Sequence, residues 1–464
     1  MGTPLVIVES PAKARTISRF LGSDYQVEAS IGHIRDLVTK VSDLPPGQQK
    51  QPGAKLGVDT DNGFVPYYVV PKDKKAQVKA LRKQVKDASA LYLATDEDRE
   101  GESISWHLLQ VLKPEIPVYR LVFHEITVSA IKKALESPRE VDESLVKAQE
   151  ARRIVDRLFG YPVSELLWRK VGPNLSAGRV QSVAVRLVVD RERARMAHVS
   201  ADWWDIRGPF IHGLGAVDAH LTQWKGSSIA TGRNFNADGK LKGKGLVILG
   251  EKEAKTAVEQ LKAGKATVES VDERPYIDRP APPFTTSTMQ QEANRRFKWA
   301  ARKTMNTAQR LYENGWITYM RTDSVALSKQ AISAARNLIA GEYGDKYLPD
   351  APRVYKGKAK NAQEAHEAIR PAGEEFRSLK EAAAALDSDQ RRLYELIWKR
   401  TVGCQMADAK GRTITVRIAA GDGTFEAKGK TVDFAGYRLA YVAESDDPEA
   451  AALDAERILP PVEK

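Results

Sequence analysis

Acidic side chains crowd the end of one apolar segment, in the stretch "LYLATDEDREGES". Asp96, Asp98 and Glu100 alternate directly after the strand-like run "LYLAT", and Gly101 allows the chain to turn into the next helix. Carboxylates at i, i+2 and i+4 of an extended segment lie on one side of it. Such oxygen ligands suit Mg²⁺, a hard ion that keeps several of its waters. Acids also commonly begin helices because they complement the helix dipole, but a further acid, Glu9, at the end of another strand favours the metal site.

A second group of polar residues stands in "VIVESPAKART". Glu9 closes a buried strand, and Ser10 can cap the following helix. Pro11 suits the first helical position, and Lys13 falls in the first turn. Ligands of open α/β sheets bind beyond the carboxyl ends of the strands, where helix N-termini favour phosphate. The pattern therefore predicts a carboxylate and an ammonium at a ligand-binding edge; a capped surface helix with an isolated Glu is the alternative.

The stretch "ENGWITYMRTDS" places a phenol in a strand-like run. Residues 317–319 follow a turn at Asn314-Gly315, and Arg321 comes two positions after Tyr319. Taken alone, this pattern is typical of a packing tyrosine followed by solvated charges. A chemical role for the phenol depends on the rest of the chain.

A basic and aromatic stripe is expected on the helix in "EARRIVDRLFGYPVSELLW". Arg153, Arg157 and Tyr161 recur every four residues and so share one helix face, with Asp156 beside them. Such a stripe can bind a phosphate backbone and stack unpaired bases, and the turn at 176–181 can add donors to phosphates. The alternative is a salt-bridged amphipathic helix.

Two other familiar site patterns are incomplete. His366, in "QEAHEAIRP", does not begin an HExxH zinc pair, because Arg370 stands where the second His should be. Gly245 and Gly250 have the spacing of a nucleotide-binding P-loop, but Glu251 stands in place of its Lys.

Composition bounds the class of protein. A chain of 464 residues suggests about three or four domains. It has no apolar run near the roughly 18 residues of a membrane span and no secretory signal, so we expect a cytoplasmic protein. Cys404 is the single cysteine, which excludes internal disulfides and Cys-based zinc sites. The net charge of +11 favours a polyanionic partner such as nucleic acid.

Hydrophobic periodicity predicts a multidomain chain with α/β, α and β parts. Strands and helices alternate in the N-terminal part, which implies a parallel sheet flanked by helices. The chain is then helical to about residue 195, with a break near "VGPNLSAG". Two β-rich pieces, at about 202–273 and from "RTITVRIAA" onward, enclose a mostly helical segment at about 286–405. The end of the chain is acidic.

Seven motifs together resemble one family. In order, "VIVESPAKA", "GHIRDL", "ATDEDREGE", "FHEIT", "LSAGRVQSVAVRL", "ITYMRTDS" and "HEAIRP" are similar to motifs of the bacterial type IA DNA topoisomerases. The similarity runs from Val6 to about Tyr441 and corresponds to the N-terminal portion of the family's core.

The resemblance implies a torus, incomplete here, built from a Toprim α/β domain, helical domains and a β-rich arch. The implied domains are Toprim, 1–140; a helical single-strand groove domain, incomplete, 141–205; the arch, 206–276 with 408–445; a helical domain carrying the tyrosine, 277–407; and an acidic tail, 446–464. Family members continue beyond the point where this sequence ends, so a truncated chain that cleaves single strands without efficient relaxation is an alternative expectation.

The resemblance also implies a mechanism. Tyr319 matches the nucleophile that attacks a single-strand phosphodiester, leaving a 5′-phosphotyrosine and a free 3′-hydroxyl, without ATP. Because a phenol with a pKa near 10 is a poor nucleophile at neutral pH, charge on the phosphate must be offset. Arg321 and His366 match positions that contact the scissile phosphate. Lys13 and Glu9 match residues that assist proton transfer to the leaving 3′-oxygen.

The remaining implied roles concern metal and DNA. The Mg²⁺ ligands matched are Glu9, Asp96, Asp98 and Glu100. The positions that match single-strand contacts are His33, Arg99, Arg153, Asp156, Arg157, Tyr161, Ser176, Ala177, Gly178, Arg179, Val180, Gln181, Gln309, Glu313, Thr318 and Thr322. The resemblance implies an enzyme that relaxes negatively supercoiled DNA by cleavage of one strand, strand passage and religation, with Mg²⁺ and without ATP. The expected protein is a nucleoid-associated monomer that acts on single-stranded segments of that DNA and does not bind membranes.

Two other classes share some of these residues. A Toprim nuclease or primase would use Glu9 and the acidic triad but would not need Tyr319. A non-catalytic single-strand-binding fragment would need the basic stripe but neither metal nor phenol.

Overall fold

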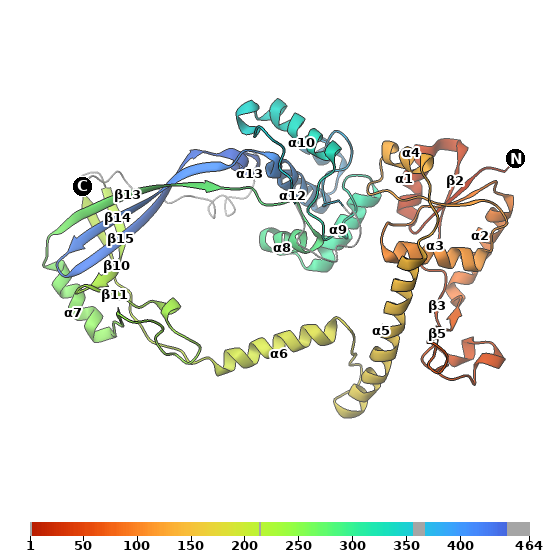
Figure 1. The fold of residues 1–464 in the computed structure, drawn as a ribbon, viewed down its shortest axis with the longest axis horizontal. Helices are drawn as coiled ribbons and strands as arrows, with labels where there is room; N and C mark the ends of the chain where they lie inside the picture. The colour runs from red at the N-terminus through yellow and green to blue at the C-terminus, as the bar shows by residue number, and fades with distance from the viewer. Residues whose placement is uncertain (1, 213–214, 356–366, 443–464) are drawn as a thin grey trace. The chain divides into compact units, whose positions relative to one another are not determined.

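The computed structural model describes residues 2–212, 215–355 and 367–442 (Figure 1). The expected acidic tail and His366 lie outside these residues. The chain divides into two compact units: Met1–Val183, Pro282–Gly341 and Ala351–Cys404 in unit 1, and Ala184–Ala281, Glu342–Asp350 and Gln405–Lys464 in unit 2.

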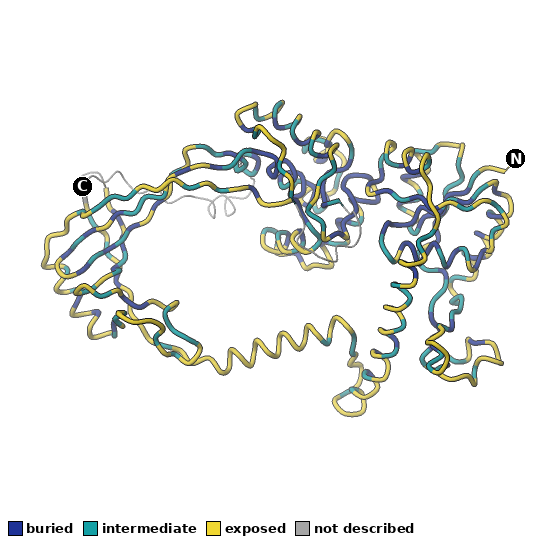
Figure 2. The backbone as a smooth tube through the Cα atoms, in the orientation of Figure 1, coloured by how far each residue is buried: buried dark blue, intermediate teal, exposed yellow. Residues whose placement is uncertain are grey.

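A parallel sheet with strand order β2-β1-β7-β8 organises the N-terminal part of unit 1. Its strands are β1 (Leu5–Val8), β2 (Gln26–Ala29), β7 (Leu91–Leu93) and β8 (Val118–Arg120). Strand β1 is buried along its whole length because helices cover the sheet, as expected for a strand inside an α/β layer (Figure 2). The alternation predicted from the sequence is confirmed here.

The other elements of this part are mostly helical. They are α1 (Pro11–Leu21), α2 (Lys75–Asp87), α3 (Arg99–Leu112) and α4 (Val128–Glu136), with the short strands β3 (Asp36–Leu37), β4 (Val58–Asp59), β5 (Val65–Pro66) and β6 (Tyr68–Val69). Helix α1 begins where the sequence predicts: the Ser10 hydroxyl accepts a hydrogen bond from the Lys13 amide at 3.2 Å, and Pro11 occupies the first turn.

The acidic turn, residues 95–101, differs from its predicted conformation. The Asp98 carboxylate caps α3 by accepting from the Gly101 amide at 2.9 Å. Glu100 therefore already lies in the first turn of α3, and the three acids do not share one side of an extended segment. An N-cap aspartate followed by acids in the first turn is favoured by the free amides there.

The remaining helices of unit 1 vary in length. They are α5 (Glu143–Lys170), α8 (Thr286–Phe297), α9 (Ala301–Glu313), α10 (Lys329–Glu342), α11 (Leu379–Ala385) and α12 (Ser388–Gln405), and the last residues of α10 and α12 belong to unit 2. Helix α6 (Gln181–Ala197) runs from unit 1 into unit 2 and has no buried residue (Figure 2).

The tyrosine segment is not the predicted strand. Ile317 forms only an isolated bridge with Pro371. The Thr318 amide donates to the Arg370 carbonyl at 2.9 Å, whereas the Tyr319 amide donates to the His124 carbonyl at 2.8 Å. Successive amides thus bond to two different segments, so no regular ladder forms although the β-rich composition suits extended backbone.

Unit 2 contains a sheet with the order β12-β11-β10-β15-β14-β13, and β9 pairs with β10. Its elements are β9 (Arg207–His212), β10 (Gly215–Trp224), β11 (Ser227–Ile229), β12 (Leu246–Val247), α7 (Glu251–Lys262), β13 (Ala266–Asp278), β14 (Ala409–Ala420), β15 (Gly423–Phe434) and α13 (Leu439–Val442). Strands from two distant stretches of sequence therefore pair in one sheet around an apolar core that includes Val416 and Phe425. In the described part of the chain, no helix combines the length and apolarity needed to cross a membrane.

The turn before the tyrosine segment requires glycine. Gly315 has φ +70°, and a Cβ there would lie 2.4 Å from the Ile126 carbonyl oxygen. We expect Gly315→Ala to lower the free energy of unfolding by about 1–3 kcal/mol, because it combines a left-handed backbone with a clash against main chain. Urea denaturation followed by circular dichroism measures this.

Gly341, inside α10, provides the matched control. A Cβ there meets nothing within 4 Å, so Gly341→Ala should be neutral or stabilise by about 0.5–1 kcal/mol through helix propensity. Equal effects of the two substitutions would contradict the assigned role of Gly315.

Candidate active site

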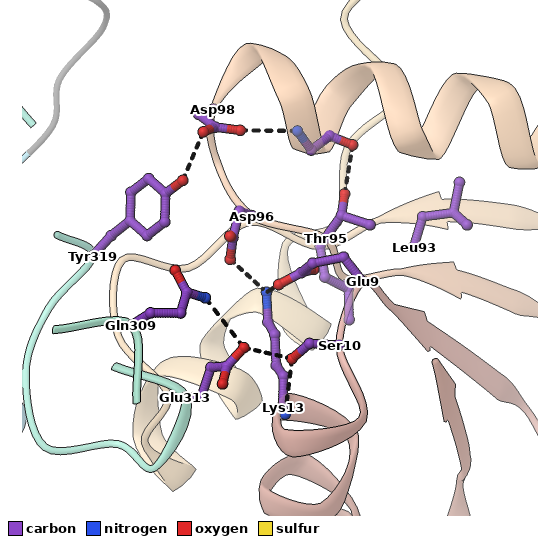
Figure 3. Close-up of polar contacts among 12 residues, drawn as sticks. Glu9, Ser10, Lys13, Leu93, Thr95, Asp96, Asp98, Gln309, Glu313 and Tyr319 are labelled. Carbon is purple, nitrogen blue, oxygen red and sulfur yellow. Dashed lines mark hydrogen bonds and ion pairs between the residues drawn. The ribbon is translucent and has the colours of Figure 1, made fainter. Parts of the chain in front are cut away.

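The site is built around a buried ammonium at the carboxyl ends of β1 and β7. The Lys13 side chain is fully buried, and its Nζ lies 3.0 Å from Asp96 Oδ1 and 3.2 Å from Glu9 Oε1 (Figure 3). Parallel strands place Glu9 and Asp96 together, and α1 returns Lys13 to the same edge. The sequence predicted that Glu9 and Lys13 lie at one sheet edge and that Glu9 joins the acids after the other strand, but it did not predict the contact between Lys13 and Asp96.

These three groups shift one another's pKa values. Burial raises the pKa of Glu9 to about 8, although the Lys13 ammonium acts in the opposite direction. Burial also disfavours the charged form of Asp96, but Lys13 outweighs it and the pKa of Asp96 is lowered. Burial would lower the pKa of Lys13, yet Asp96 and Glu9 together raise it. Lys13 and Asp96 are therefore ionised at neutral pH, and Glu9 holds a proton.

The Tyr319 phenol points at the acidic turn. Its side chain is 2% exposed, and the hydroxyl donates to Asp98 Oδ2 at 2.6 Å (Figure 3). Burial, with Asp96 and Asp98 nearby, raises the pKa of Tyr319. The phenol is consequently neutral and oriented by the carboxylate.

Arg321 lies on the solvent side of the same acids. Its Nη1 is 2.7 Å from Glu100 Oε2 and 3.3 Å from Asp98 Oδ2, and the side chain is about half exposed. Asp98 therefore binds the tyrosine hydroxyl and the guanidinium through the same carboxylate oxygen. This arrangement places a cation beside the phenol where an anion from solvent can reach it.

Helix α9 closes another side of the site. Glu313 accepts from the Ser10 hydroxyl at 2.7 Å and from Gln309 Nε2 at 3.1 Å. Gln309 and Glu313 line a pocket of about 430 Å³ together with Arg321 and the acids of the turn. The tyrosine-bearing segment and the Toprim-like sheet thus meet at a polar opening within unit 1.

A buried ion pair holds the tyrosine segment in place. Arg370 is almost fully buried; its Nη1 donates to Glu125 Oε2 at 2.8 Å, and it forms two bonds to Glu367 at 2.7 and 2.8 Å. The Thr318 hydroxyl donates to the Ala368 carbonyl, which places Tyr319 beside this network. Glu125 and Arg370 stand in the motifs "FHEIT" and "HEAIRP", but no local pattern indicates that the two side chains pair.

The basic stripe on α5 is only partly available to a ligand. Arg153 forms two bonds to the Asp36 carboxylate, at 3.0 and 2.5 Å, and both side chains are partly exposed. Arg157 is buried, donates to the Val38 carbonyl at 2.7 Å and lies 4.4 Å from the centre of the Tyr161 ring. Of the two guanidinium groups, Arg153 is the one that solvent reaches.

The turn at 176–181 is folded back on α5. The Ala177 amide donates to Ser164 Oγ at 3.0 Å, and Gln181 Nε2 donates to Ser176 Oγ at 3.1 Å. Arg179 pairs with Asp156 through two bonds of 2.8 and 3.0 Å. Gly178 and Val180 complete this exposed turn.

The other expected DNA contacts are distributed around the acids. His33 Nε2 lies 4.0 Å from Glu100 Oε1, and burial lowers the pKa of His33. Arg99 Nε is buried and has no hydrogen-bond partner in the described part of the chain. Thr322 is buried, and its amide donates to the Thr286 hydroxyl at 2.9 Å. His366 lies outside the described residues, so its position is not part of this geometry.

Whether the acids fit a metal ion can be judged from their present partners. Among residues 2–212, 215–355 and 367–442, no group of three or more His, Cys, Asp or Glu side chains is arranged to hold a metal ion. The acids instead pair with Lys13, Tyr319 and Arg321. Glu9 Oε1 is buried and, apart from the Lys13 ammonium 3.2 Å away, has no hydrogen-bond partner among the described residues. An all-oxygen donor set with a buried carboxylate oxygen that only Lys13 compensates fits a hard divalent cation.

Comparisons with known proteins agree with this geometry. Residues 140–464 match the family described as DNA topoisomerase, and residues 4–126 match the Toprim domain. Toprim domains typically bind metal ions.

Individual relatives are similar over nearly the whole chain. The sequence is 53% identical to DNA topoisomerase 1 of Streptomyces coelicolor, over 99% of this chain and 49% of that protein. It is also 53% identical to DNA topoisomerase 1 of Synechocystis sp., over 99% of this chain and 51% of the relative. The chain thus spans about half the length of these curated relatives.

A solved structure shares the fold. Full-length topoisomerase I from Thermotoga maritima has a TM-score of 0.75 and 35% identity to this chain, covering 96% of this chain and 69% of that one. The predicted fold class, a Toprim α/β domain with helical and β-rich parts of a type IA core, is confirmed by these matches.

The raised pKa of Glu9 generates a test on stability. Below pH 4.5 Glu9 is protonated in both folded and unfolded chains; between pH 4.5 and about 8 only the folded protein keeps the proton. The contribution of this group is complete below pH 4.5 and is lost as pH rises through about 8. In EDTA, the metal-free protein should therefore lose unfolding free energy as pH rises across this window, on the order of 1 kcal/mol per pH unit at most.

Glu9→Gln cannot titrate and should show a flatter dependence between pH 5 and 8 in urea denaturation. Glu143→Gln, at a side chain that is 76% exposed, serves as the control and should follow the wild type. Superimposable pH dependences of wild type and Glu9→Gln would contradict the buried, protonated Glu9.

Proposed function

This chain belongs to the DNA topoisomerase family, and on that premise we propose that it cleaves and rejoins one strand of DNA through Tyr319. In the proposed reaction the phenolic oxygen attacks a phosphodiester, the bond from phosphorus to the 3′-oxygen breaks, and a 5′-phosphotyrosine forms. One phosphodiester replaces another, so religation by the 3′-hydroxyl needs no ATP.

The observation that carries the proposal is the Tyr319 hydroxyl held by Asp98 beside Arg321. Asp98 is the acceptor in contact with the phenolic proton, so it can take that proton as the oxygen attacks. Arg321, half exposed, can offset charge on the phosphate in the transition state. A neutral, oriented phenol with a base and a cation at hand is a suitable nucleophile for this reaction.

The leaving 3′-oxygen needs a proton in return. Glu9, whose pKa burial raises to about 8, carries one near neutral pH, and a donor with a pKa near the working pH is effective. Lys13 remains charged and can stabilise the negative charge that develops on the leaving oxygen. We propose Glu9 as the proton donor and Lys13 as its electrostatic partner.

We propose Mg²⁺ as the metal, held by oxygens of Glu9, Asp96, Asp98 and Glu100. When bound, the ion would neutralise acidic charge near the DNA phosphate and help to hold the broken end for religation. Carboxylates repel one another and a phosphate until a cation compensates them. The acids of this chain provide the ligands, and Lys13 keeps two of them together.

The single strand is proposed to run along the exposed arginines near α5. Arg153 and Arg179 are bound by Asp36 and Asp156 at the surface, and exposed pairs of this kind are worth little. A DNA phosphate can therefore replace the aspartate at modest cost, with affinity that falls as salt rises. Relaxation of negatively supercoiled DNA by strand passage, action as a monomer and association with the nucleoid belong to the same proposal.

Removing the phenolic hydroxyl tests the nucleophile. Tyr319→Phe should abolish the covalent adduct with an end-labelled single-stranded oligonucleotide, while the dissociation constant for that oligonucleotide stays within about twofold, because a single contact is lost. Denaturing gels detect the adduct, and fluorescence anisotropy gives the affinity.

Tyr312→Phe is the matched control, because the Tyr312 ring lies 5.2 Å from the Tyr319 ring and is equally buried. Its adduct should persist. An adduct retained in Tyr319→Phe would refute the assignment and favour a Toprim nuclease.

Neutralising the acids tests the metal. Asp96→Asn with Asp98→Asn should lower Mg²⁺ affinity at least about tenfold in calorimetric titration, because two ligand charges are removed. Cleavage should fall as well, because Asp98 is also the proposed base for Tyr319. The surface double variant Asp24→Asn with Asp73→Asn, at two exposed acids of unit 1, should bind Mg²⁺ as the wild type does. Undiminished affinity in the first variant would remove the acids from the metal site.

A further inference from the structure

Arg120, the last residue of β8, is a fully buried cation outside the proposed reaction. Burying a guanidinium is costly unless every donor finds an acceptor. Arg120 meets that requirement mostly with backbone carbonyls. The positions of these carbonyls indicate which part of the chain Arg120 orients.

The guanidinium binds the backbone of the acidic turn. Its Nη2 donates to the Asp96 carbonyl at 2.6 Å, and Nη1 donates to the Thr95 carbonyl at 2.8 Å. Nη1 also contacts the carbonyls of Leu93 and Leu121, at 3.1 and 2.6 Å. One planar group thus fixes two consecutive peptide units at the exit of β7. These peptide orientations determine where the Asp96 side chain points.

Gly101 confines the same carbonyl from another direction. A Cβ at Gly101 would lie 2.1 Å from the Asp96 carbonyl oxygen, so the backbone at Gly101 closely approaches the backbone at Asp96. The Thr95 hydroxyl also donates to the Gly101 carbonyl at 2.7 Å. The acidic turn therefore has little freedom to rearrange while Arg120 remains bonded.

Glu102 orients Arg120 in turn. Its Oε2 accepts from Arg120 Nε at 3.0 Å, and both side chains are fully buried. Arg139 forms two further bonds to Glu102, at 2.8 and 3.0 Å, and is 39% exposed. Two arginines thus share one glutamate, but of these two only Arg120 reaches the carbonyls of the acidic turn in the described structure.

We propose that Arg120 is a positioning residue for the metal-binding acids, acting through the backbone carbonyls of Thr95 and Asp96. The inference rests on the proposed function, because that function makes Asp96 and Asp98 metal ligands. Outer partners that orient ligands typically change metal affinity by about 10–100-fold when replaced. Arg120 would do so without touching the metal, the DNA or Tyr319.

The test compares Arg120→Lys with Arg139→Lys. A lysine at 120 keeps the positive charge facing Glu102 but cannot bond Glu102 and both carbonyls together, because it lacks the planar fork. We expect the Mg²⁺ concentration for half-maximal religation to rise about tenfold in Arg120→Lys, with adduct formation in EDTA within about twofold of wild type. Arg139→Lys should leave the Mg²⁺ dependence within about twofold, because Arg139 makes no bond to the turn.

Two measurements distinguish a general loss of stability from a positioning role: the melting temperature, and the separate rates of cleavage and religation. A merely structural Arg120 would lower melting temperature and reduce cleavage and religation together, with unchanged Mg²⁺ half-saturation; that result overturns the inference. Equal Mg²⁺ shifts in both lysine variants would also overturn it, since the effect would then come from Glu102 rather than the carbonyls.

Gly101→Ala provides a second route if Arg120→Lys fails to fold. It brings a Cβ against the Asp96 carbonyl oxygen and changes neither side chain of the Arg120–Glu102 pair. A raised Mg²⁺ requirement with cleavage retained is expected, and a wild-type requirement overturns the inference. Asp96→Asn alone leaves the proposed base Asp98 in place and distinguishes the two proposals in the same assay. No shift in its Mg²⁺ requirement refutes the metal role in the proposed function, whereas a shift there without one in Arg120→Lys refutes only the role of Arg120.

Discussion

The site depends on a positive charge that compensates the carboxylates which the parallel sheet brings together at one buried edge. Lys13 supplies the compensation: its buried ammonium lies between Glu9 and Asp96. One cation cannot keep both acids ionised, so the two buried acids differ in protonation: Asp96 is charged and Glu9 is protonated. The protonated Glu9 can thus act as an acid beside the charged Asp96, and Glu9 Oε1 has only the Lys13 ammonium near it among the described residues. The proposed chemistry thus depends on the fold holding two buried carboxyl groups beside a single ammonium.

Charge compensation also determines how the tyrosine segment meets the sheet. Asp98 is satisfied by two groups from one distant segment, the Tyr319 hydroxyl and Arg321. Glu125, on the sheet side, is satisfied by Arg370 from the helical part of unit 1. Removing either partner would leave an unpaired buried or half-buried charge, which costs more than the contact itself contributes. The phenol is therefore held in reach of the acids by pairs that form only when both segments are in place.

Local sequence patterns predicted much of this arrangement, but they did not predict the contacts between residues that are distant in sequence. Ser10, Pro11 and the strand "LVIV" predicted the start of α1 and the meeting of Glu9 with Asp96, because caps and parallel strand ends are local or topological features. The prediction that the acidic turn is extended was wrong, because Asp98 caps α3. The prediction of a strand at 317–319 was wrong, because its amides bond to two separate loops. The burial of Arg120, Arg157 and Arg370 depends on carbonyls and carboxylates far away in sequence, which no local pattern encodes. The domain boundaries stay predictions.

Those three arginines change the meaning of the basic composition. A net charge of +11 suggests a surface for a polyanion, yet Arg120, Arg157 and Arg370 are buried and spend their donors on the protein itself. Arg153 and Arg179 are exposed, but each is bound by an aspartate that phosphate can replace. In the proposed function, DNA binding would exchange a carboxylate for a phosphate at a few surface arginines, while the buried arginines determine where the acids and the phenol lie. Composition alone cannot separate the two groups. Their acceptors do, because the buried arginines bond to buried carbonyls and carboxylates, whereas Arg153 and Arg179 bond to partly exposed aspartates that a phosphate can replace.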